Sequence, residues 1–252
     1  MRKFVILLLI SLFSEQLSAI CAAASLTVYP RTGTLKQNSL IILEGYGESQ
    51  KITTGLNKKY PIYLQCGSKK IYLIAKEVHK GLFRVTQALL IPIKPLEVGL
   101  EYTLHIDSLD KYEHLDYWDY KSETTKQVKW KIVAETDVTK PIVTANPKVI
   151  KKSYQEFGCG PSASVLFNCP AKDESGILVK GVMTNLKSGK ITTYYIEPYE
   201  NLIMIGHDMC SGPFNFEDGG YYEIQFTFFD SCGNKSEWKG KPIRFTKPTK
   251  TN

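Results

Sequence analysis

Cys210 and His207 lie close together in a glycine-flanked stretch, GHDMCSG at 206–212. A cysteine with a nearby histidine can act as a nucleophile and its base, as in thiol enzymes. Such a site also needs a group that orients the histidine, and the neighbour of that kind is Asp208, whose side chain would point the other way on an extended backbone. No pattern typical of cysteine hydrolases surrounds Cys210 or Cys159. We therefore predict no enzyme, with a small thiol enzyme using Cys210 and His207 as an alternative.

Metal binding is the second chemistry that the side chains allow. The four histidines are widely separated, and the cysteines do not form the two close pairs of a structural zinc site. Asp173, Asp230 and Asn234 fall in two turn-like stretches, and oxygen atoms of this kind bind Ca²⁺. Asp and Asn are also ordinary turn formers. We predict no cofactor and keep these three residues as weak calcium candidates.

The stretch 110–120, DKYEHLDYWDY, places aromatic rings among carboxylates. Its candidate binding residues are Tyr112, Tyr117, Trp118 and Tyr120, because tyrosine and tryptophan dominate binding hot spots and loops on a rigid scaffold carry function. Aromatic faces flanked by carboxylates would also suit a sugar ring. The alternative is a loop folded over the sheet edge, with its aromatic rings covering the core.

The N-terminus has the order of a secretory signal peptide. Basic residues at 2–3 precede an apolar run at 4–13, and alanines follow at 22–24. We predict cleavage after Ala24 and a secreted, periplasmic or cell-surface protein. Lipid attachment at Cys21 is a weaker alternative, because Ile20 stands where a small residue is expected. No later segment reaches the roughly 18 apolar residues of a membrane-spanning helix, so we expect none in the mature chain.

The basic residues are spread along the chain. Lys and Arg number 32 against 25 Asp and Glu, a net charge of +7, without a concentrated basic block. Together with export, this argues against a nucleic-acid partner.

Short runs rich in β-branched and aromatic residues, broken by turn formers, predict an all-β chain with almost no helix. The expected strands are 26–29, 40–43, 62–66, 71–78, 88–93, 102–106, 128–133, 142–145, 164–169, 177–183, 191–196, 202–205, 222–228 and 242–245. A polar segment ending at Pro141 interrupts this rhythm and reads as a short linker. The predicted parts are a signal peptide at 1–24, domains at 25–136 and 137–248, and a flexible tail at 249–252.

A short pattern repeats in the two halves: an apolar residue, then glycine, then tyrosine, at 96–102 and again at 216–222. Tyr102 and Tyr222 each begin an alternating strand. Sandwich domains place a corner tyrosine at such a position, with its hydroxyl bonded to nearby backbone. The repeat favours two related sandwiches.

These stretches resemble bacterial immunoglobulin-like modules. The first half is similar to surface-layer-type domains, through Tyr29-Pro30-x-x-Gly33 and the segment 92–104. The second half resembles immunoglobulin-like or fibronectin-like modules, through segments 137–141, 171–176 and 229–236. The resemblance implies two tandem antiparallel β-sandwiches and a surface-displayed binding, spacer or assembly module of a bacterium, and it implies no catalysis.

An exported chain is expected to oxidise its cysteines. Cys169 and Cys232 share strand faces with core residues, which favours a Cys169–Cys232 disulfide and leaves Cys159 to pair with Cys210, although four cysteines allow three pairings. The Cys159–Cys210 bond would stabilise the second domain by about 3–4 kcal/mol in the loop-entropy model. Cys66 is then a lone, buried thiol.

We therefore expect an exported, non-enzymatic adhesion, ligand-binding or envelope-structural module. Its partner would be a protein or a glycan at the cell envelope. A carbohydrate-binding accessory protein that uses the 112–120 loop is the alternative.

Overall fold

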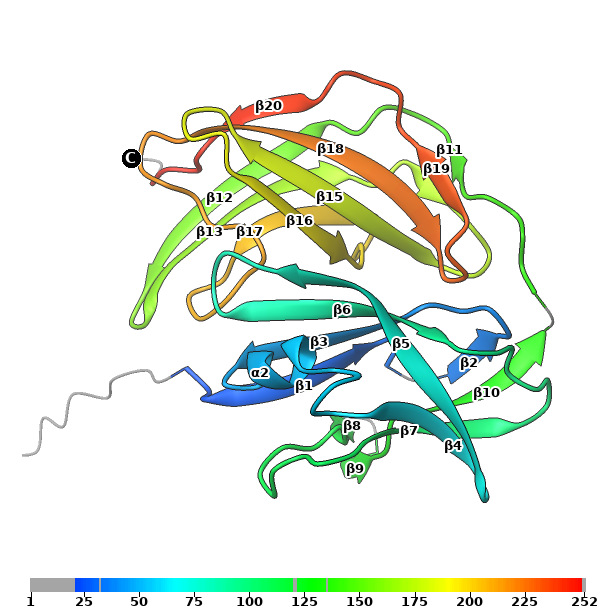
Figure 1. Cartoon of the computed structure of the whole chain (residues 1–252). Coiled ribbons are helices and arrows are strands. Elements are labelled where there is room, and N and C mark those ends of the chain that lie inside the picture. Colours follow the sequence, from blue (N-terminus) through cyan, green and yellow to red (C-terminus); the bar gives the residue numbers. More distant parts are fainter. Residues whose placement is uncertain (1–20, 32, 120–121, 135, 251–252) are drawn as a thin grey trace, which may run out of the picture.

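The computed structural model of the chain describes residues 21–250, except 32, 120, 121 and 135. Residues 1–20, with most of the expected signal peptide, lie outside this part, as does the end of the expected tail. The described chain is nearly all β, as predicted, with one short helix, α2 (Gln50–Thr54) (Figure 1). That helix is too short to cross a membrane, and no described helix can do so.

The strands of the first half form one continuous, bent sheet. In chain order they are β1 (Ala24–Tyr29), β2 (Gly33–Lys36), β3 (Ile41–Gly47), β4 (Ile62–Cys66), β5 (Lys69–Lys80), β6 (Val85–Pro92), β7 (Glu101–Ile106) and β10 (Lys129–Ala134). Two further short strands, β8 (Tyr117–Asp119) and β9 (Thr124–Lys126), pair with each other. The strand order is β1-β3-β6-β5-β4-β7-β10-β2.

Strand β5 turns this sheet back on itself. Its beginning pairs with β4 and its end pairs with β6. A register shift between Ala75 and Glu77 marks a bulge, which bends a strand and increases its twist. The two layers enclose a core that includes Leu43, Tyr102 and Trp130.

One pairing differs from the expected antiparallel arrangement: β2 runs parallel to β10. Strand β1 pairs with β3, and the short connection after Tyr29 then carries the chain to the opposite edge of the bent sheet. There it meets a strand from the far end of the same half. A hairpin cannot form between such distant segments, so either direction is open to them.

The second half contains two larger sheets packed face to face and a small two-stranded sheet formed by its strands at 142–143 and 171–172. Its strands are β11 (Ile142–Val143), β12 (Val149–Phe157), β13 (Gly160–Asn168), β14 (Ala171–Lys172), β15 (Ile177–Asn185), β16 (Ile191–Ile196), β17 (Leu202–His207), β18 (Tyr221–Asp230), β19 (Lys235–Glu237) and β20 (Ile243–Thr246). One sheet has the order β12-β13-β17 and the other β16-β15-β18-β19, with β20 also paired to β18. Buried residues alternate strictly along β18, and Phe167, Phe226 and Phe228 lie in the core between the sheets.

Both predicted corner tyrosines are confirmed. The Tyr102 hydroxyl accepts a hydrogen bond from the Glu97 backbone N–H at 3.3 Å, and the Tyr222 hydroxyl accepts one from the Glu217 N–H at 2.6 Å. The glycine in each repeat, Gly99 or Gly219, has a positive φ, of 85° and 61° respectively. The same local device therefore starts an inner strand in each half.

The halves pack against each other through an apolar cluster of Leu40, Ile42, Leu89, Leu178 and Tyr195. In Figure 1 the second half lies above the first, with the end of β5 of the first half next to β16 of the second. Gln87, buried in β6, bonds the edge of β16: its Oε1 accepts from the Tyr195 N–H at 2.5 Å, and its Nε2 donates to the Tyr195 carbonyl at 3.1 Å. The Gln87 side chain thus makes the two hydrogen bonds to the Tyr195 backbone that a neighbouring strand would otherwise make.

Candidate functional site

A surface cleft of about 520 Å³ opens beside the junction of the two halves. Leu166, Leu202 and Met204 come from strands β13 and β17, at positions that alternate with core residues and so face away from the core. The opposite wall comes from β16 and the turn that follows it. The lining is Glu44, Leu166, Tyr194, Tyr195, Ile196, Glu197, Tyr199, Leu202, Met204 and Pro213.

The cleft keeps large apolar side chains exposed. Met204 is 52% exposed and Tyr199 is 76% exposed. A contiguous exposed apolar surface on a rigid scaffold is typical of an interaction site. The volume falls in the range of small-molecule pockets, roughly 300–1,000 Å³.

Glu44 is the first of two carboxyl groups in this cleft. It extends from β3 of the first half, and its Oε2 accepts a hydrogen bond from the Tyr194 hydroxyl at 2.7 Å. Burial raises the pKa of Glu44, and the Tyr194 hydrogen bond only partly offsets this. Burial and the adjacent Glu44 carboxylate in turn raise the pKa of Tyr194. No cation is among the groups that shift the pKa of Glu44.

Glu197 is the second carboxyl group. It borders both the cleft and an adjoining cavity of about 220 Å³. Burial raises the pKa of Glu197, and the charge of Arg31 partly offsets this. Burial and the Glu197 charge raise the pKa of Tyr29 to about 12. The lining of the cleft therefore combines the half-buried Glu44 with the more exposed Glu197, and Arg31 is the cation whose charge acts on Glu197.

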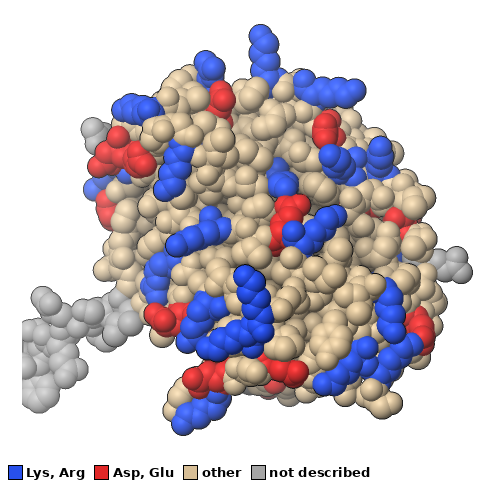
Figure 2. Space-filling model, viewed as in Figure 1, with Lys and Arg blue, Asp and Glu red and all other residues tan. Residues whose placement is uncertain are grey.

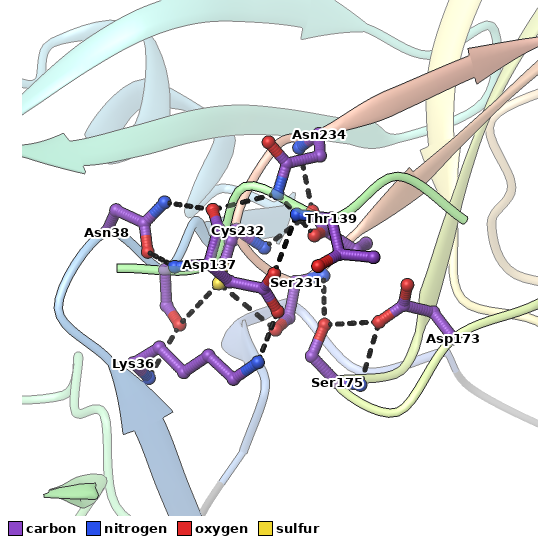
Figure 3. A network of polar contacts seen from close by, with 11 residues as sticks. Lys36, Asn38, Asp137, Thr139, Asp173, Ser175, Ser231, Cys232 and Asn234 are labelled. Atoms are coloured by element: carbon purple, nitrogen blue, oxygen red, sulfur yellow. Dashed lines mark hydrogen bonds and ion pairs between the residues drawn. The ribbon is translucent and has the colours of Figure 1, made fainter. Parts of the chain in front are cut away.

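A polar network at the linker contains the residues predicted as weak calcium candidates (Figure 3). The Asp230 side chain accepts hydrogen bonds from the backbone of Cys232 and Asn234, at 2.9 and 2.7 Å, and from the Asn234 amide at 2.6 Å. Asp173 instead accepts from the backbone and hydroxyl of Ser175. Donors from the protein thus occupy these carboxylates, as in ordinary turns.

Asp137, at the predicted domain boundary, belongs to the same network. It pairs with Lys36, which lowers the pKa of its carboxyl group. Its backbone carbonyl accepts from the amides of Asn38 and Asn234 at 2.9 Å each. Asp137, Asp230 and Cys232 place possible ligand atoms within 4.8 Å of one another. Because a lysine and backbone N–H groups already bind the carboxylate oxygens of Asp137 and Asp230, we interpret these residues as a structural network that holds the linker in place.

The aromatic stretch does not form one platform in its described part. Tyr112 is 78% exposed, whereas Tyr117 is half-buried against the first core and lies under the Arg31 guanidinium, 5.6 Å from its ring centre. The side chain of Trp118 and the whole of Tyr120 lie outside the described residues. The proposed glycan surface stays a prediction.

The cysteine pairs differ from those expected. Cys210 forms a disulfide with Cys21, and not with the predicted partner Cys159, at a Cα–Cα distance of 5.6 Å. The predicted Cys169–Cys232 bond is absent, and both residues are thiols. Strand parity placed both on the core side, but packing of the halves holds the Cys232 sulfur 3.7 Å from the Ser39 hydroxyl, at the junction. Cys66 is a half-buried thiol against the first core.

His207 does not face a thiolate. Cys210 is oxidised in the structure, and the His207 ring packs against Phe83 and Phe216, with centroid distances of 5.7 and 6.3 Å. Its Nδ1 lies 2.8 Å from the Asp208 backbone carbonyl. The side chain of Asp208 points elsewhere and accepts from the Cys210 and Ser211 N–H groups, at 2.7 Å each.

Charge shows no dominant patch on the face seen in Figure 2, where Lys and Arg are scattered among Asp and Glu over both halves.

The sequence did not predict the cleft. Its residues come from β3, β13, β16 and β17 and from the turns after β16 and β17, and the signal was limited to apolar residues at outward positions of the strands.

Comparison with known proteins gives distant structural similarities. No protein family and no curated protein sequence matches the chain. It is similar to type I pullulanase from Bacillus subtilis strain 168 in complex with maltose, at 9% identity and a TM-score of 0.24 over 90% of this chain and 24% of the pullulanase. The chain thus spans about a quarter of the length of that enzyme.

Two further solved structures are similar at the same level. A cytokine receptor complex aligns at 8% identity and a TM-score of 0.27, over 90% of this chain and 98% of the other. The Yersinia pseudotuberculosis adhesin InvE aligns at 9% identity and 0.23, over 88% and 58%. At these scores the similarities carry no argument about function.

Proposed function

We propose that the protein is an exported, non-enzymatic binding module that acts through the cleft between β16 and β17. Its ligand is an amphipathic molecule with an apolar body and a cationic head. The two halves serve as tandem immunoglobulin-like sandwiches that hold the cleft rigidly, without covalent chemistry. The observation that carries this proposal is the combination, in one cleft, of exposed apolar walls with the carboxyl groups of Glu44 and Glu197.

The charge balance favours a cationic head. Burial raises the pKa of both glutamates, so each is costly to ionise in the empty cleft. A bound cation near them would offset that cost. An anionic ligand would increase it, and an uncharged ligand would not offset it.

The apolar body of the proposed ligand would pack against the apolar walls of the cleft. Covering Met204 and Tyr199 removes apolar surface from water, which stabilises a complex by about 25 cal/mol per Å². The two hydrogen bonds between the Gln87 side-chain amide and the Tyr195 backbone fix one wall against the first half. The cleft therefore needs little ordering before a ligand binds.

Calorimetric titration with octylamine and with octanol tests this function. We expect octylamine to bind more tightly, and Glu44→Gln to reduce that preference. Met204→Ser should weaken both by about fivefold, since it removes about 1 kcal/mol of apolar contact. Ile191→Ser is the matched control, because Ile191 is also an exposed strand residue but does not line the cleft. Equal affinity of the two probes for the wild-type protein would contradict the cationic head.

Export is tested separately. N-terminal sequencing of the protein recovered from outside the producing cell should begin at Ser25. An intact N-terminus on protein confined to the cell interior would refute export while leaving the binding test unaffected.

A further inference from the structure

Three cysteines from distant parts of the chain meet at one end of the second half. The sulfur atoms of Cys21, Cys159 and Cys210 all lie within 4.8 Å of one another. Two of them form the Cys21–Cys210 disulfide. The third sulfur therefore lies next to an existing disulfide.

Cys159 and Cys210 are held together by the second half alone. Strands β13 and β17 pair with Ala163 opposite His207, and the Ser162 hydroxyl donates to the His207 carbonyl at 3.2 Å. Continuing this register beyond the strand ends brings the β12–β13 turn, with Cys159, to the loop with Cys210. A Cβ atom on Gly160 would lie 3.7 Å from the Met209 carbonyl oxygen, so the two loops are in contact.

Cys21, in contrast, is held by the edge of the first half. Its segment continues β1 along β3, where the Glu48 N–H donates to the Ala23 carbonyl at 3.1 Å. Arg84 donates to the Ala22 carbonyl at 3.3 Å. The position of Cys21 thus depends on a short terminal segment, whereas that of Cys159 depends on a central sheet.

We propose that Cys21, Cys159 and Cys210 form a disulfide-exchange site in which Cys210 changes its partner from Cys21 to Cys159. The Cys159 thiolate attacks the Cys210 sulfur, the Cys159–Cys210 bond forms and the Cys21–Cys210 bond breaks. Cys21 leaves as a thiolate and takes up the proton that Cys159 lost. One disulfide replaces another, so the step needs no oxidant.

The exchange has a consequence for processing, which rests on the export proposed above. Cleavage after Ala24 would leave the N-terminal peptide attached to the protein through the Cys21–Cys210 bond. Attack by Cys159 releases that peptide and closes the second half with its own disulfide. Before cleavage, the short segment between Cys21 and β1 keeps the Cys21 thiol close to Cys210, which favours re-formation of the Cys21–Cys210 bond.

The test uses the full chain with Cys21→Ser, folded in a glutathione redox buffer at pH 8. Thiols are then blocked with N-ethylmaleimide, and disulfides are mapped by non-reducing peptide mass spectrometry. We expect wild-type protein to contain the Cys21–Cys210 bond, and the Cys21→Ser variant to contain Cys159–Cys210 in most molecules. Cys66→Ser is the control and should keep the wild-type pattern, because Cys66 lies in the first half.

Circular dichroism of each variant confirms that it is folded. A folded Cys21→Ser variant in which N-ethylmaleimide labels both Cys159 and Cys210 would overturn the proposal. If that variant does not fold, Cys159→Ser gives the second measurement. In this measurement the chain is cut between Cys21 and Ser25. Release of the N-terminal peptide that carries Cys21 from the wild-type protein, but its retention in the Cys159→Ser variant, supports exchange. Equal loss from both would overturn it.

Discussion

Replacing Gln87 with leucine should weaken the interaction between the two halves of the protein. The Gln87 amide makes two hydrogen bonds with the backbone of Tyr195, at 2.5 and 3.1 Å, and both residues are buried. Leucine has a similar size but no polar atoms, so the Tyr195 N–H and carbonyl would both lose their partner. A buried group left without a partner costs about 1–3 kcal/mol. For two such groups we therefore expect a loss of about 2–6 kcal/mol in the free energy of unfolding.

Urea denaturation followed by tryptophan fluorescence measures this loss. Gln65→Leu is the matched control, since the Gln65 amide makes one exposed hydrogen bond, 2.9 Å from the Gly67 carbonyl oxygen, and surface changes alter stability by about 0.5 kcal/mol or less. For Gln87→Leu we expect the single transition to split or to shift strongly. A change no larger than that of Gln65→Leu would refute the reasoning that these bonds hold β16 to the first half.

Two further predictions concern single residues. Because burial raises the pKa of Glu44 above its ordinary 4.5, the folded state holds this proton more tightly than the unfolded state. The stabilisation of the folded state by this proton is therefore complete below pH 4.5 and is lost as the pH rises through the pKa of Glu44 in the folded protein. Urea titrations should show wild type losing stability relative to Glu44→Gln between pH 4 and pH 7, and a constant difference would contradict the buried position. Gly206→Ala should destabilise the protein by about 3 kcal/mol, since its Cβ would lie 2.1 Å from the Ala163 carbonyl oxygen. Gly189→Ala, also at positive φ but with open space around it, should cost about 1 kcal/mol by thermal denaturation, and equal losses would count against the close approach.

Local sequence predicted the strands where a core face alternates with a solvent face. The expected strands 62–66 and 191–196 coincide with β4 and β16, and the expected 222–228 lies within β18. The missed elements lack that signal. Strand β12 is exposed or half-buried along its whole length, and α2 is a single short turn between two strands.

The candidate site was less predictable than the fold. The composition of the aromatic stretch predicts a binding surface, yet Tyr117 packs partly into the first core. The cleft instead gathers side chains of ordinary type, such as Leu166, Met204 and Glu44, from strands far apart in the chain. Nothing in their local context distinguishes them from other surface residues.

By itself the sequence determined the all-β class and the two corner tyrosines, because alternation and the glycine–tyrosine spacing act over a few neighbouring residues. Only the tertiary structure decided what depends on distant contacts. Packing of the halves brought Glu44 to the cleft and gave Tyr195 its bonds to Gln87. It also moved Cys232 to the junction and brought Cys21 to Cys210, 189 positions apart in the chain. A cysteine's sequence position does not identify its partner, since a disulfide requires two sulfurs to meet in space and the chain's path alone determines whether they do.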